Sequence, residues 1–445
     1  MRLDGEKREG VGKGSSALGG PVGLKLSATL TEGGEQVTDG VHFKVRELGS
    51  DGSPGAYISD QWGSPFLELE PGTYRVEVSY DLAGAEADVE VLDKGTTRHT
   101  FVLDAGYLRP QALLKQGGTR VTEGVLFNLY EMQTDLQGNR RRLADRWGKP
   151  VFYVNAGTYH LTTVYDLAQE EQDVEVKAGE ISDPVAVLNA GYLKPHAVLV
   201  AGGEQVSDGV LFNLYETKTD LHGNRRRLAD RWGAPLFYVG EGKYLLDVRY
   251  GNAHADQEVE ITADELLEPT VVLDAGYLRP TAVRKDGAEP ITDGVQFIVS
   301  EAKQDLHGKR RGVADAWNSP LFNLNAGRYY VTVAFGNASA AQELEIKAGE
   351  MLEPTIVLNA GELRPTAVLD GKPVTEGVNF AVYEAAQDLH GKRRGIADAW
   401  GAPAFQVNAG TYLIHAQQGG AQADLEVEVK AGESVAPELT LVAPQ

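Results

Sequence analysis

The sequence contains no cysteine and no long apolar run. The absence of cysteine excludes disulfides, thiolate metal sites and cysteine nucleophiles. No segment approaches the roughly 18 consecutive apolar residues that a membrane-spanning helix needs, so we expect no membrane insertion. No stretch of ten or more residues carries an apolar period of about 3.6 with capping residues, so we also expect almost no helix.

Positive charge is scarce, because 42 lysines and arginines stand against 64 acidic residues, for a net charge of -22. Nucleic acid and anionic membranes would repel such a chain, which excludes them as default partners. The segment 1–22 is rich in Gly, Ser and Lys and has no apolar run after its early charges. We therefore interpret it as a flexible tail and not as a signal peptide.

One unit is repeated five times along the chain. Tryptophan returns every 85 residues, and after 83 in the last interval, and one phenylalanine and one tyrosine keep the same rhythm: Trp62, Trp147, Trp232, Trp317, Trp400; Phe43, Phe127, Phe212, Phe297, Phe380; Tyr74, Tyr159, Tyr244, Tyr329 and Tyr412. The unit has the length of a small domain. We predict five domains, which we call copies 1 to 5, at residues 23–105, 106–190, 191–275, 276–360 and 361–445.

Short alternating segments separated by turn residues fill each copy. In copy 2 the pattern predicts about seven strands, at 107–115, 125–131, 142–147, 151–154, 159–165, 173–177 and 184–189. This is typical of an all-β fold, and we predict a linear array of five immunoglobulin-like β-sandwich domains of about 85 residues each. The side chains expected to face the core of copy 2 are Val125, Phe127, Leu129, Trp147, Phe152, Tyr159, Leu161 and Val174.

A tyrosine opens a late strand of every copy, in a Gly-x-Tyr sequence that follows a turn. In β-sandwiches a tyrosine at such a corner often donates its hydroxyl to nearby backbone. We predict this structural role for all five tyrosines.

The segments DGVLFNLYE, VNAGTYHLTTVY and VEVKAGE together resemble bacterial immunoglobulin-like and carboxypeptidase-regulatory-like (prealbumin-type) sandwich modules. Such modules occur in tandem on envelope and secreted proteins, so the resemblance implies an extracellular or cell-surface location. The chain is also similar to pilin modules that form Lys–Asn isopeptide bonds. Asn189 and Asn359 alternate with Asp104 and Asp274 at the matching position, and no lysine recurs in the first strand. We therefore expect no such crosslinks.

The copies follow one another without a linker, since each ends in VLNAG or VLDAG and runs directly into the next first strand. Sandwiches joined this closely have little room to swivel, so we expect a stiff rod. Copy 1 is atypical in one loop, which reads LGSDGSPGAY where copy 2 has TDLQGNRRR.

Residues that could carry chemistry do not form a catalytic pattern. His222, His307 and His390 share one loop position, but copy 2 has Gln137 there, so we predict no enzymatic activity and no cofactor. Calcium needs six to eight oxygen ligands, and one or two aspartates beside basic residues supply too few. We interpret the first aspartate of each pair as shaping its own turn and the second as pairing with an arginine; the pairs are Asp220 with Asp230, Asp305 with Asp315, and Asp388 with Asp398.

A basic loop stands out on four copies of this acidic chain, at Arg140, Arg141, Arg142, Arg225, Arg226, Arg227, Lys309, Arg310, Arg311, Lys392, Arg393 and Arg394. It is either a solvated hairpin tip or a positive site that docks on an acidic surface, because guanidinium groups bind carboxylates well. The partner would be a neighbouring chain, another envelope protein or an anionic polysaccharide. Two functions remain open: a structural stalk or filament, and an adhesin-like or carbohydrate-binding array.

Overall fold

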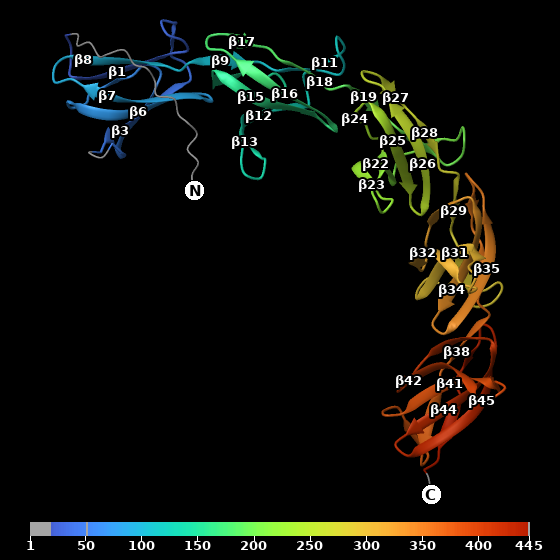
Figure 1. Ribbon diagram of the computed structural model, residues 1–445. Helices are drawn as coiled ribbons and strands as arrows, with labels where there is room; N and C mark the ends of the chain where they lie inside the picture. The colour runs from blue at the N-terminus through green and yellow to red at the C-terminus, as the bar shows by residue number, and fades with distance from the viewer. Residues whose placement is uncertain (1–18, 50–51, 444–445) are drawn as a thin grey trace. The chain divides into compact units, whose positions relative to one another are not determined.

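The computed structural model describes residues 19–49 and 52–443, and over these ranges it contains β-strands and no helix (Figure 1). The all-β prediction is therefore confirmed, and no described segment is a helix that is long and apolar enough to cross a membrane. Most of the tail expected at 1–22, and residues 50–51 of the atypical loop, lie outside the described residues. The chain divides into two compact units: Met1–Lys194 with Leu236–Tyr244 and Glu260–Glu268, and Pro195–Pro235 with Leu245–Val259 and Pro269–Gln445.

Copy 1 lies in the first unit and consists of two facing sheets. A four-stranded antiparallel sheet has the order β4-β3-β6-β7, and a second sheet has the order β2-β1-β5, with β8 added in parallel to β1. The strands are β1 (Gly23–Thr29), β2 (Gln36–Val37), β3 (Val41–Leu48), β4 (Pro54–Trp62), β5 (Phe66–Leu67), β6 (Gly72–Tyr80), β7 (Ala83–Val91) and β8 (Thr96–Val102).

Copy 2, also in the first unit, repeats the four-stranded sheet as β13-β12-β15-β16. Its second layer is split into two short sheets, β14-β9-β17 and β11-β10-β18. The strands are β9 (Ala105–Leu108), β10 (Gln111–Leu113), β11 (Arg120–Val121), β12 (Val125–Thr134), β13 (Arg140–Trp147), β14 (Phe152–Asn155), β15 (Gly157–Tyr165), β16 (Ala168–Val176), β17 (Ile181–Ser182) and β18 (Val185–Val187).

In copy 3 the sheet β24-β19-β27 belongs to the first unit, with β19 (Ala190–Leu193), β24 (Phe237–Gly240) and β27 (Leu266–Leu267). The second unit begins with the sheet β21-β20-β28, made of β20 (His196–Val198), β21 (Gln205–Val206) and β28 (Thr270–Val272). The four-stranded order β23-β22-β25-β26 returns with β22 (Val210–Thr219), β23 (Arg225–Trp232), β25 (Gly242–Tyr250) and β26 (Ala253–Ile261).

Copies 4 and 5 lie in the second unit and repeat this arrangement. Copy 4 has the four-stranded sheet β32-β31-β34-β35 and the short sheets β33-β29-β36 and β30-β37. Copy 5 has the four-stranded sheet β42-β41-β44-β45 and the short sheets β43-β38-β46 and β40-β39-β47. The strands of copy 4 are β29 (Ala275–Leu278), β30 (Thr281–Val283), β31 (Val295–Gln304), β32 (Arg310–Trp317), β33 (Phe322–Asn325), β34 (Gly327–Phe335), β35 (Ala338–Ile346), β36 (Met351–Leu352) and β37 (Thr355–Val357). Those of copy 5 are β38 (Ala360–Leu363), β39 (Thr366–Leu369), β40 (Lys372–Val374), β41 (Asn379–Gln387), β42 (Arg393–Trp400), β43 (Phe405–Asn408), β44 (Gly410–Gln418), β45 (Ala421–Val429), β46 (Ser434–Val435) and β47 (Glu438–Leu441). The repeated sandwich-like unit is thus established, while the five domain boundaries stay a prediction.

The first strand of copy 2 is broken, where the sequence predicted one strand over 107–115. Pro110 has no N–H to donate, and the backbone hydrogen bonds pass around it, from Arg109 N to the Ser182 carbonyl and from Gln111 N to the Pro184 carbonyl. Copy 1 has Leu26 at this place, and its N–H donates to the Pro65 carbonyl. Strand β1 is therefore continuous.

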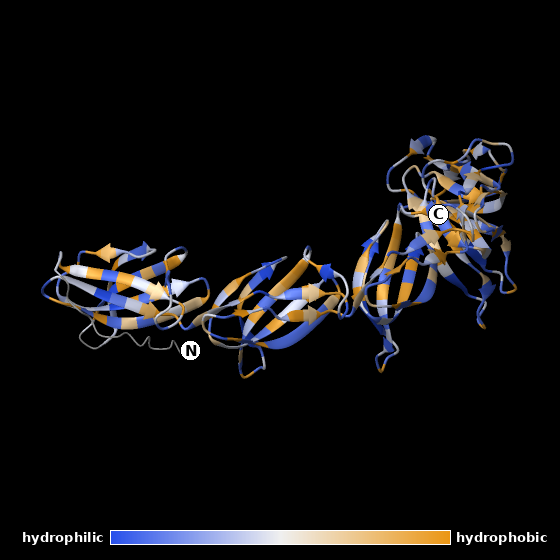
Figure 2. Ribbon diagram, turned by 90° about the horizontal axis from the view of Figure 1, so that it is seen from above, coloured by the Kyte–Doolittle hydropathy of each residue, from blue (hydrophilic) through white to orange (hydrophobic). Residues whose placement is uncertain are grey.

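The alternation of side chains builds the cores, as the striped hydropathy of the strands shows (Figure 2). In copy 2 most of the expected core residues are buried, among them Val125, Phe127, Leu129, Phe152 and Leu161, none of which exposes any of its side-chain area. Val174 is buried as well, and Tyr159 packs against this cluster from a partly buried position. The core prediction is confirmed for these seven residues.

The prediction that Trp147 faces the core is wrong. Trp147 is 64% exposed, and the tryptophans of the other copies are exposed to a similar extent. The register pairs Trp147 with Leu126, on the outer face, and pairs Arg146 with the core residue Phe127. The guanidinium of Arg146 accordingly covers the Phe152 ring at 4.7 Å. An irregularity at Leu129/Tyr130 shifts the pairing of the two strands, and a shift of one residue exchanges the faces.

The tyrosine prediction is confirmed in all five copies. Each hydroxyl donates to the backbone carbonyl four residues earlier, at 2.7 to 2.9 Å: Tyr74 to Glu70, Tyr159 to Asn155, Tyr244 to Gly240, Tyr329 to Asn325 and Tyr412 to Asn408. The tyrosine thus fixes the turn that connects the two layers of the sandwich.

Candidate functional site

The basic loop of copy 2 is a tight hairpin between β12 and β13. Asp135 shapes it, since its carboxylate oxygen Oδ1 accepts the N–H groups of Gln137 (2.9 Å) and Asn139 (2.8 Å). Its carbonyl accepts the N–H of Gly138, which has a φ of 84°. The N–H of Asn139, followed by other donors of the turn, lowers the pKa of Asp135 below its usual range. Asp220, Asp305 and Asp388 form the same turn, as the sequence predicted.

The residue after this aspartate is a leucine whose side chain lies entirely in solvent. The exposed fractions are 101% for Leu136, 103% for Leu221, 102% for Leu306 and 103% for Leu389. These leucines were not predicted from the sequence, where only the charges of the loop stood out. The Asp-Leu-x-Gly spacing could have predicted their exposure, since the leucine follows an aspartate whose hydrogen bonds close the turn around it.

One arginine of each loop forms an ion pair across the hairpin with a glutamate of the preceding strand. The pairs are Arg141 with Glu131, Arg226 with Glu216, Arg311 with Glu301 and Arg394 with Glu384. Exposed pairs of this kind contribute little to stability, up to about 1 kcal/mol. They do reduce the net positive charge that the loop offers to a partner.

Four other basic side chains of the loops also have partners on the protein, either on the outer face of a sheet or at an aspartate three residues later. Arg310 lies over the Tyr330 ring at 4.1 Å, on the outer face of its sheet, and Arg393 contacts Glu426 at 3.3 Å. Arg142 and Arg227 pair with the aspartates three residues later, Asp145 and Asp230, at 3.5 and 3.4 Å. The structure aligns Arg310 with Arg140 and not with Arg141, so the triplets of copies 4 and 5 begin one residue earlier than those of copies 2 and 3.

Copy 4 departs from the expected pairing of the second aspartate. Gly312 stands where copy 2 has Arg142, and the partner of Asp315 is Gln296, whose side-chain amide donates to Oδ2 at 3.4 Å. The arginine pair is therefore formed as expected at Asp230, and at Asp315 an amide contact replaces it. Asp145, for which no expectation was stated, forms the arginine pair as well.

A second cluster of polar contacts lies at the joint between copies 1 and 2, inside the first unit. The turn between β6 and β7 docks on β14: the N–H of Leu82 donates to the Tyr153 carbonyl at 3.0 Å, and the N–H of Tyr153 donates to Asp81 Oδ2 at 3.0 Å. Arg146 forms an ion pair with Asp81, and the Leu82 side chain packs against the core of copy 2. The sequence predicted a short joint but none of these contacts.

Asn155, in β14, bonds both β7 and the residue that follows β8 at this joint. Its side-chain oxygen accepts the N–H of Gly84 at 3.2 Å, and its amide nitrogen donates to the carbonyls of Gly84 (3.1 Å) and Leu103 (2.6 Å). The side chain therefore satisfies backbone groups of copy 1 as a further strand would. The same bridges recur in the second unit, where Asn325 binds His254 and Leu273, and Asn408 binds Ser339 and Leu358.

The joints are of two kinds. In the first unit Asp81 and Asp166, both with a φ of 55°, accept the N–H groups of Tyr153 and Tyr238. In the second unit Gly251 and Gly336 take the place of these aspartates, and the side chains of Asn252 and Asn337 donate to the carbonyls of Val313 (3.4 Å) and Ile396 (3.1 Å). Copy 3 differs again, because Gly240 stands where copies 2, 4 and 5 have the bridging asparagine.

The positions that suggested isopeptide chemistry have a conformational explanation. Asp104, Asn189, Asp274 and Asn359 all adopt a positive φ, between 45° and 47°. Asn and Asp are the non-glycine residues that accept this conformation most readily, which explains why they alternate here. Their carbonyls accept the N–H groups of Ala156, Glu241, Ala326 and Ala409 at 2.6 to 2.7 Å.

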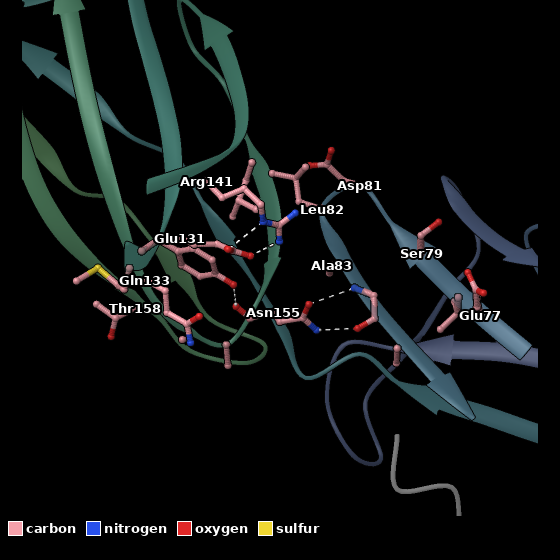
Figure 3. Close-up of a pocket in the computed structure, with 18 of the residues that line it drawn as sticks. Glu77, Ser79, Asp81, Leu82, Ala83, Glu131, Gln133, Arg141, Asn155 and Thr158 are labelled. Atoms are coloured by element: carbon pink, nitrogen blue, oxygen red, sulfur yellow. Dashed lines mark hydrogen bonds and ion pairs between the residues drawn. The ribbon is translucent and has the colours of Figure 1, made fainter. Parts of the chain in front are cut away.

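A cavity of about 610 Å³ opens beside the first joint (Figure 3). Its wall includes Asn155 with its bonds to Gly84, the ion pair of Arg141 with Glu131, and the side chain of Leu82. The hairpin and the joint of copy 2 are therefore adjacent, and both border one solvent-filled space.

The comparison with protein-family models found no match, and neither did the comparison with curated proteins. Among solved structures, the chain matches the Bacillus anthracis TIE protein with 15% identity over 73% of this chain and 69% of that chain, at a TM-score of 0.18. It matches a streptococcal ancillary pilin with 16% identity over 56% of this chain and 98% of that chain, at a TM-score of 0.24. It also matches the minor pilin of Streptococcus agalactiae with 13% identity over 38% of this chain and 98% of that chain, at a TM-score of 0.21. These TM-scores are too low to carry an argument about function. The resemblance to tandem sandwich modules, expected from the sequence, is confirmed for the fold by the strands themselves.

Proposed function

We propose that the chain is a structural repeat protein of a bacterial surface, a non-catalytic stalk or filament component outside the cell. The observation that carries the proposal is the built joint. Backbone hydrogen bonds link the turn of one copy to the second layer of the next, from Leu82 to Tyr153 and from Leu167 to Tyr238 in the first unit. In the second unit they run from Asn252 to Asn323 and from Asn337 to Gln406.

Domains of one chain commonly move relative to each other. A connection that permits such motion does not need backbone hydrogen bonds between the domains. Here each turn contributes a backbone donor, and three joints add an asparagine bridge. A chain that transmits force or keeps a spacing benefits from joints that resist bending. The expected rod remains part of this proposal.

We further propose that the hairpin tips contact neighbouring chains, with the twelve basic residues and the four exposed leucines acting together. The leucines supply the apolar contact and the arginines set its orientation, because electrostatics contributes more to register than to affinity. Each contact is weak, so only several tips engaged at once give stable association. The rest of the surface carries the negative charge that such a tip meets.

The test is self-association of the full chain, measured by sedimentation velocity and by electron microscopy at low salt. Replacing all four tip leucines (Leu136, Leu221, Leu306 and Leu389) by Ser should reduce association strongly, while Ile181→Ser, which removes another exposed apolar side chain, should leave it unchanged. Polymers with the wild-type chain are expected. Monodisperse wild-type protein at all salt concentrations would contradict the proposal.

The charges have a matched control within the chain. Arg141, Arg226, Arg311 and Arg394 are each paired with a glutamate. Arg109, Lys194, Arg279 and Arg364 are paired with carboxylates in the second layer of the same four copies. Changing either set to Gln alters the net charge equally. Only the hairpin set should weaken association, and an equal effect of both sets would show that bulk charge alone is responsible.

A further inference from the structure

The five tryptophans share an exposed position that neither the cores nor the joints require. Their exposed fractions run from 59% at Trp317 to 69% at Trp400. Each follows an aspartate by two residues, and the alternation of a strand places both side chains on the same outer face: Asp60, Asp145, Asp230, Asp315 and Asp398. One indole is exposed at the same place in every copy, and few tryptophans are exposed on a protein beyond those that its function needs.

At Trp62 this surface is hollowed. A cavity of about 570 Å³ is lined by the indole together with Asp39, His42, Ser79 and Arg146. The His42 ring lies 4.7 Å from the Trp62 ring, and its Nε2 atom is 3.4 Å from Asp60 Oδ2. The indole is therefore held in place by its neighbours while one face stays open.

We propose that this cavity binds an uncharged pyranose unit of a polysaccharide. A pyranose has an apolar face of C–H groups and a rim of hydroxyls. The C–H face would stack on the open face of Trp62, as apolar groups do on aromatic rings. The hydroxyls would donate to the Asp39 carboxylate and exchange hydrogen bonds with Ser79 and His42, which offer both donors and acceptors.

The charges around the cavity favour an uncharged sugar over an acidic one. The Arg146 guanidinium is paired with Asp81, so the cationic group at the rim is neutralised locally. Asp39 and Asp60 add negative charge, and the chain as a whole carries -22. An anionic polysaccharide or a nucleic acid would be repelled.

An acidic residue precedes a glycine at the phase of Asp39 in the other copies too, at Glu123, Asp208, Asp293 and Glu376. The histidine is not repeated, because Leu126, Leu211, Gln296 and Asn379 pair with the other tryptophans. The proposed site therefore belongs to copy 1. The site requires no self-association, so it is independent of the proposed structural function.

The test uses the full chain with Trp62 as its single tryptophan, obtained with W147F, W232F, W317F and W400F. These four side chains are largely exposed, so the replacements should not affect folding, which circular dichroism verifies. Cellohexaose, chitohexaose and mannohexaose are titrated while the fluorescence of Trp62 is recorded. At least one should change the emission saturably, and Asp39→Ala should weaken that binding about tenfold, the effect of losing about 1.4 kcal/mol.

Asp93→Ala is the matched control, because it removes an equally charged, exposed side chain outside the cavity. It should leave the affinity unchanged. The proposal is overturned if none of the three hexasaccharides binds saturably, or if Asp39→Ala and Asp93→Ala weaken binding equally. Binding of polygalacturonate in preference to all three, with loss at high salt, would also overturn it, since the site would then be one for anions.

Discussion

The side-chain amide of Asn155 spans the first joint, accepting the N–H of Gly84 and donating to the Leu103 carbonyl 2.6 Å away. With its further bond to the Gly84 carbonyl, this one side chain supplies hydrogen bonds to three backbone groups of copy 1. A backbone group without a partner is unfavourable, so copy 1 depends on copy 2 for part of its own stability.

Replacing Asn155 by Ala should destabilise the chain by about 1–3 kcal/mol, because Gly84 and Leu103 lose their partners. Amide hydrogen exchange at Gly84 should become faster, and denaturant unfolding gives the free energy. Asn139→Ala is the control, since that side chain reaches only Asp135 in an exposed turn, at 3.3 Å. Equal effects of the two replacements would show that the bridge contributes nothing.

The joint between copies 2 and 3 offers the reverse experiment. Gly240 occupies the place of the bridging asparagine, its φ is not positive, and a side chain there would meet its nearest neighbours, the Tyr244 hydroxyl and the Asn189 carbonyl, at 3.8 and 3.9 Å. Gly240→Asn should add the missing bridge and stabilise the protein by about 1 kcal/mol. Gly240→Ala, measured by the same thermal unfolding, separates this bridge from the loss of backbone freedom. If both variants gain equally, the amide forms no bridge.

The exposed position of the tryptophans changes what a truncation should do. Trp232→Ala should alter the free energy of unfolding by only about 0.5 kcal/mol, as at other surface positions. Phe212→Ala, in a residue with no exposed area, should lower it by about 3–5 kcal/mol. Denaturant unfolding of both variants measures the contrast, and a large loss with Trp232→Ala would mean that its indole is buried in solution.

Glu362 should make the stability of the second unit depend on pH. It replaces the tyrosine of copies 2, 3 and 4. Hydrogen bonds from Arg364 above all, with smaller contributions from Ser434 and Gln406, lower its pKa to about 2. A lowered pKa in the folded state stabilises the protein above the ordinary pKa, and this contribution disappears as the pH falls toward about 2. The difference in melting temperature between the wild type and Glu362→Gln should therefore be present at pH 6 and decrease below about pH 4.5. A difference that stays constant over this range would contradict the assignment.

The joints should also limit bending of the chain in solution. Inserting a Gly-Ser segment after Ala275 separates the contacts of Asn252 and Asn325 from their partners. Small-angle scattering should then show a more flexible chain than the wild type. If both chains scatter alike, the joints are already loose and the expected rod is wrong.

Most of the fold could be predicted from the sequence because the relevant signals are local. Alternation along Val125, Phe127 and Leu129 identified the inner face, and the Gly-x-Tyr corner identified the tyrosine contact, since both depend on neighbouring residues only. The face of Trp147 was wrong because it depends on the register between two strands, which an irregularity shifts.

The functional surfaces were harder to infer from the sequence. The basic residues were visible as a charged run, but their ion pairs with Glu131 and its equivalents are made across a hairpin. The exposed leucines and the contacts of Asn155 were missed altogether. A leucine at a turn and an asparagine at a strand end are common, and only the spatial arrangement shows what they contact.

The two kinds of joint restrict which changes in length the gene can tolerate by recombination between its repeats. Loss of copy 2 would bring Asp81 beside Arg231 and Tyr238, a pairing of the same kind as the present one, and loss of copy 4 would similarly join two partners of the glycine–asparagine kind. Loss of copy 3 would place Asp166 opposite Ala316 and Asn323, where no arginine stands. Shorter natural variants should therefore lack copy 2 or copy 4, and all of them should retain copy 3, which lies between the two kinds of joint.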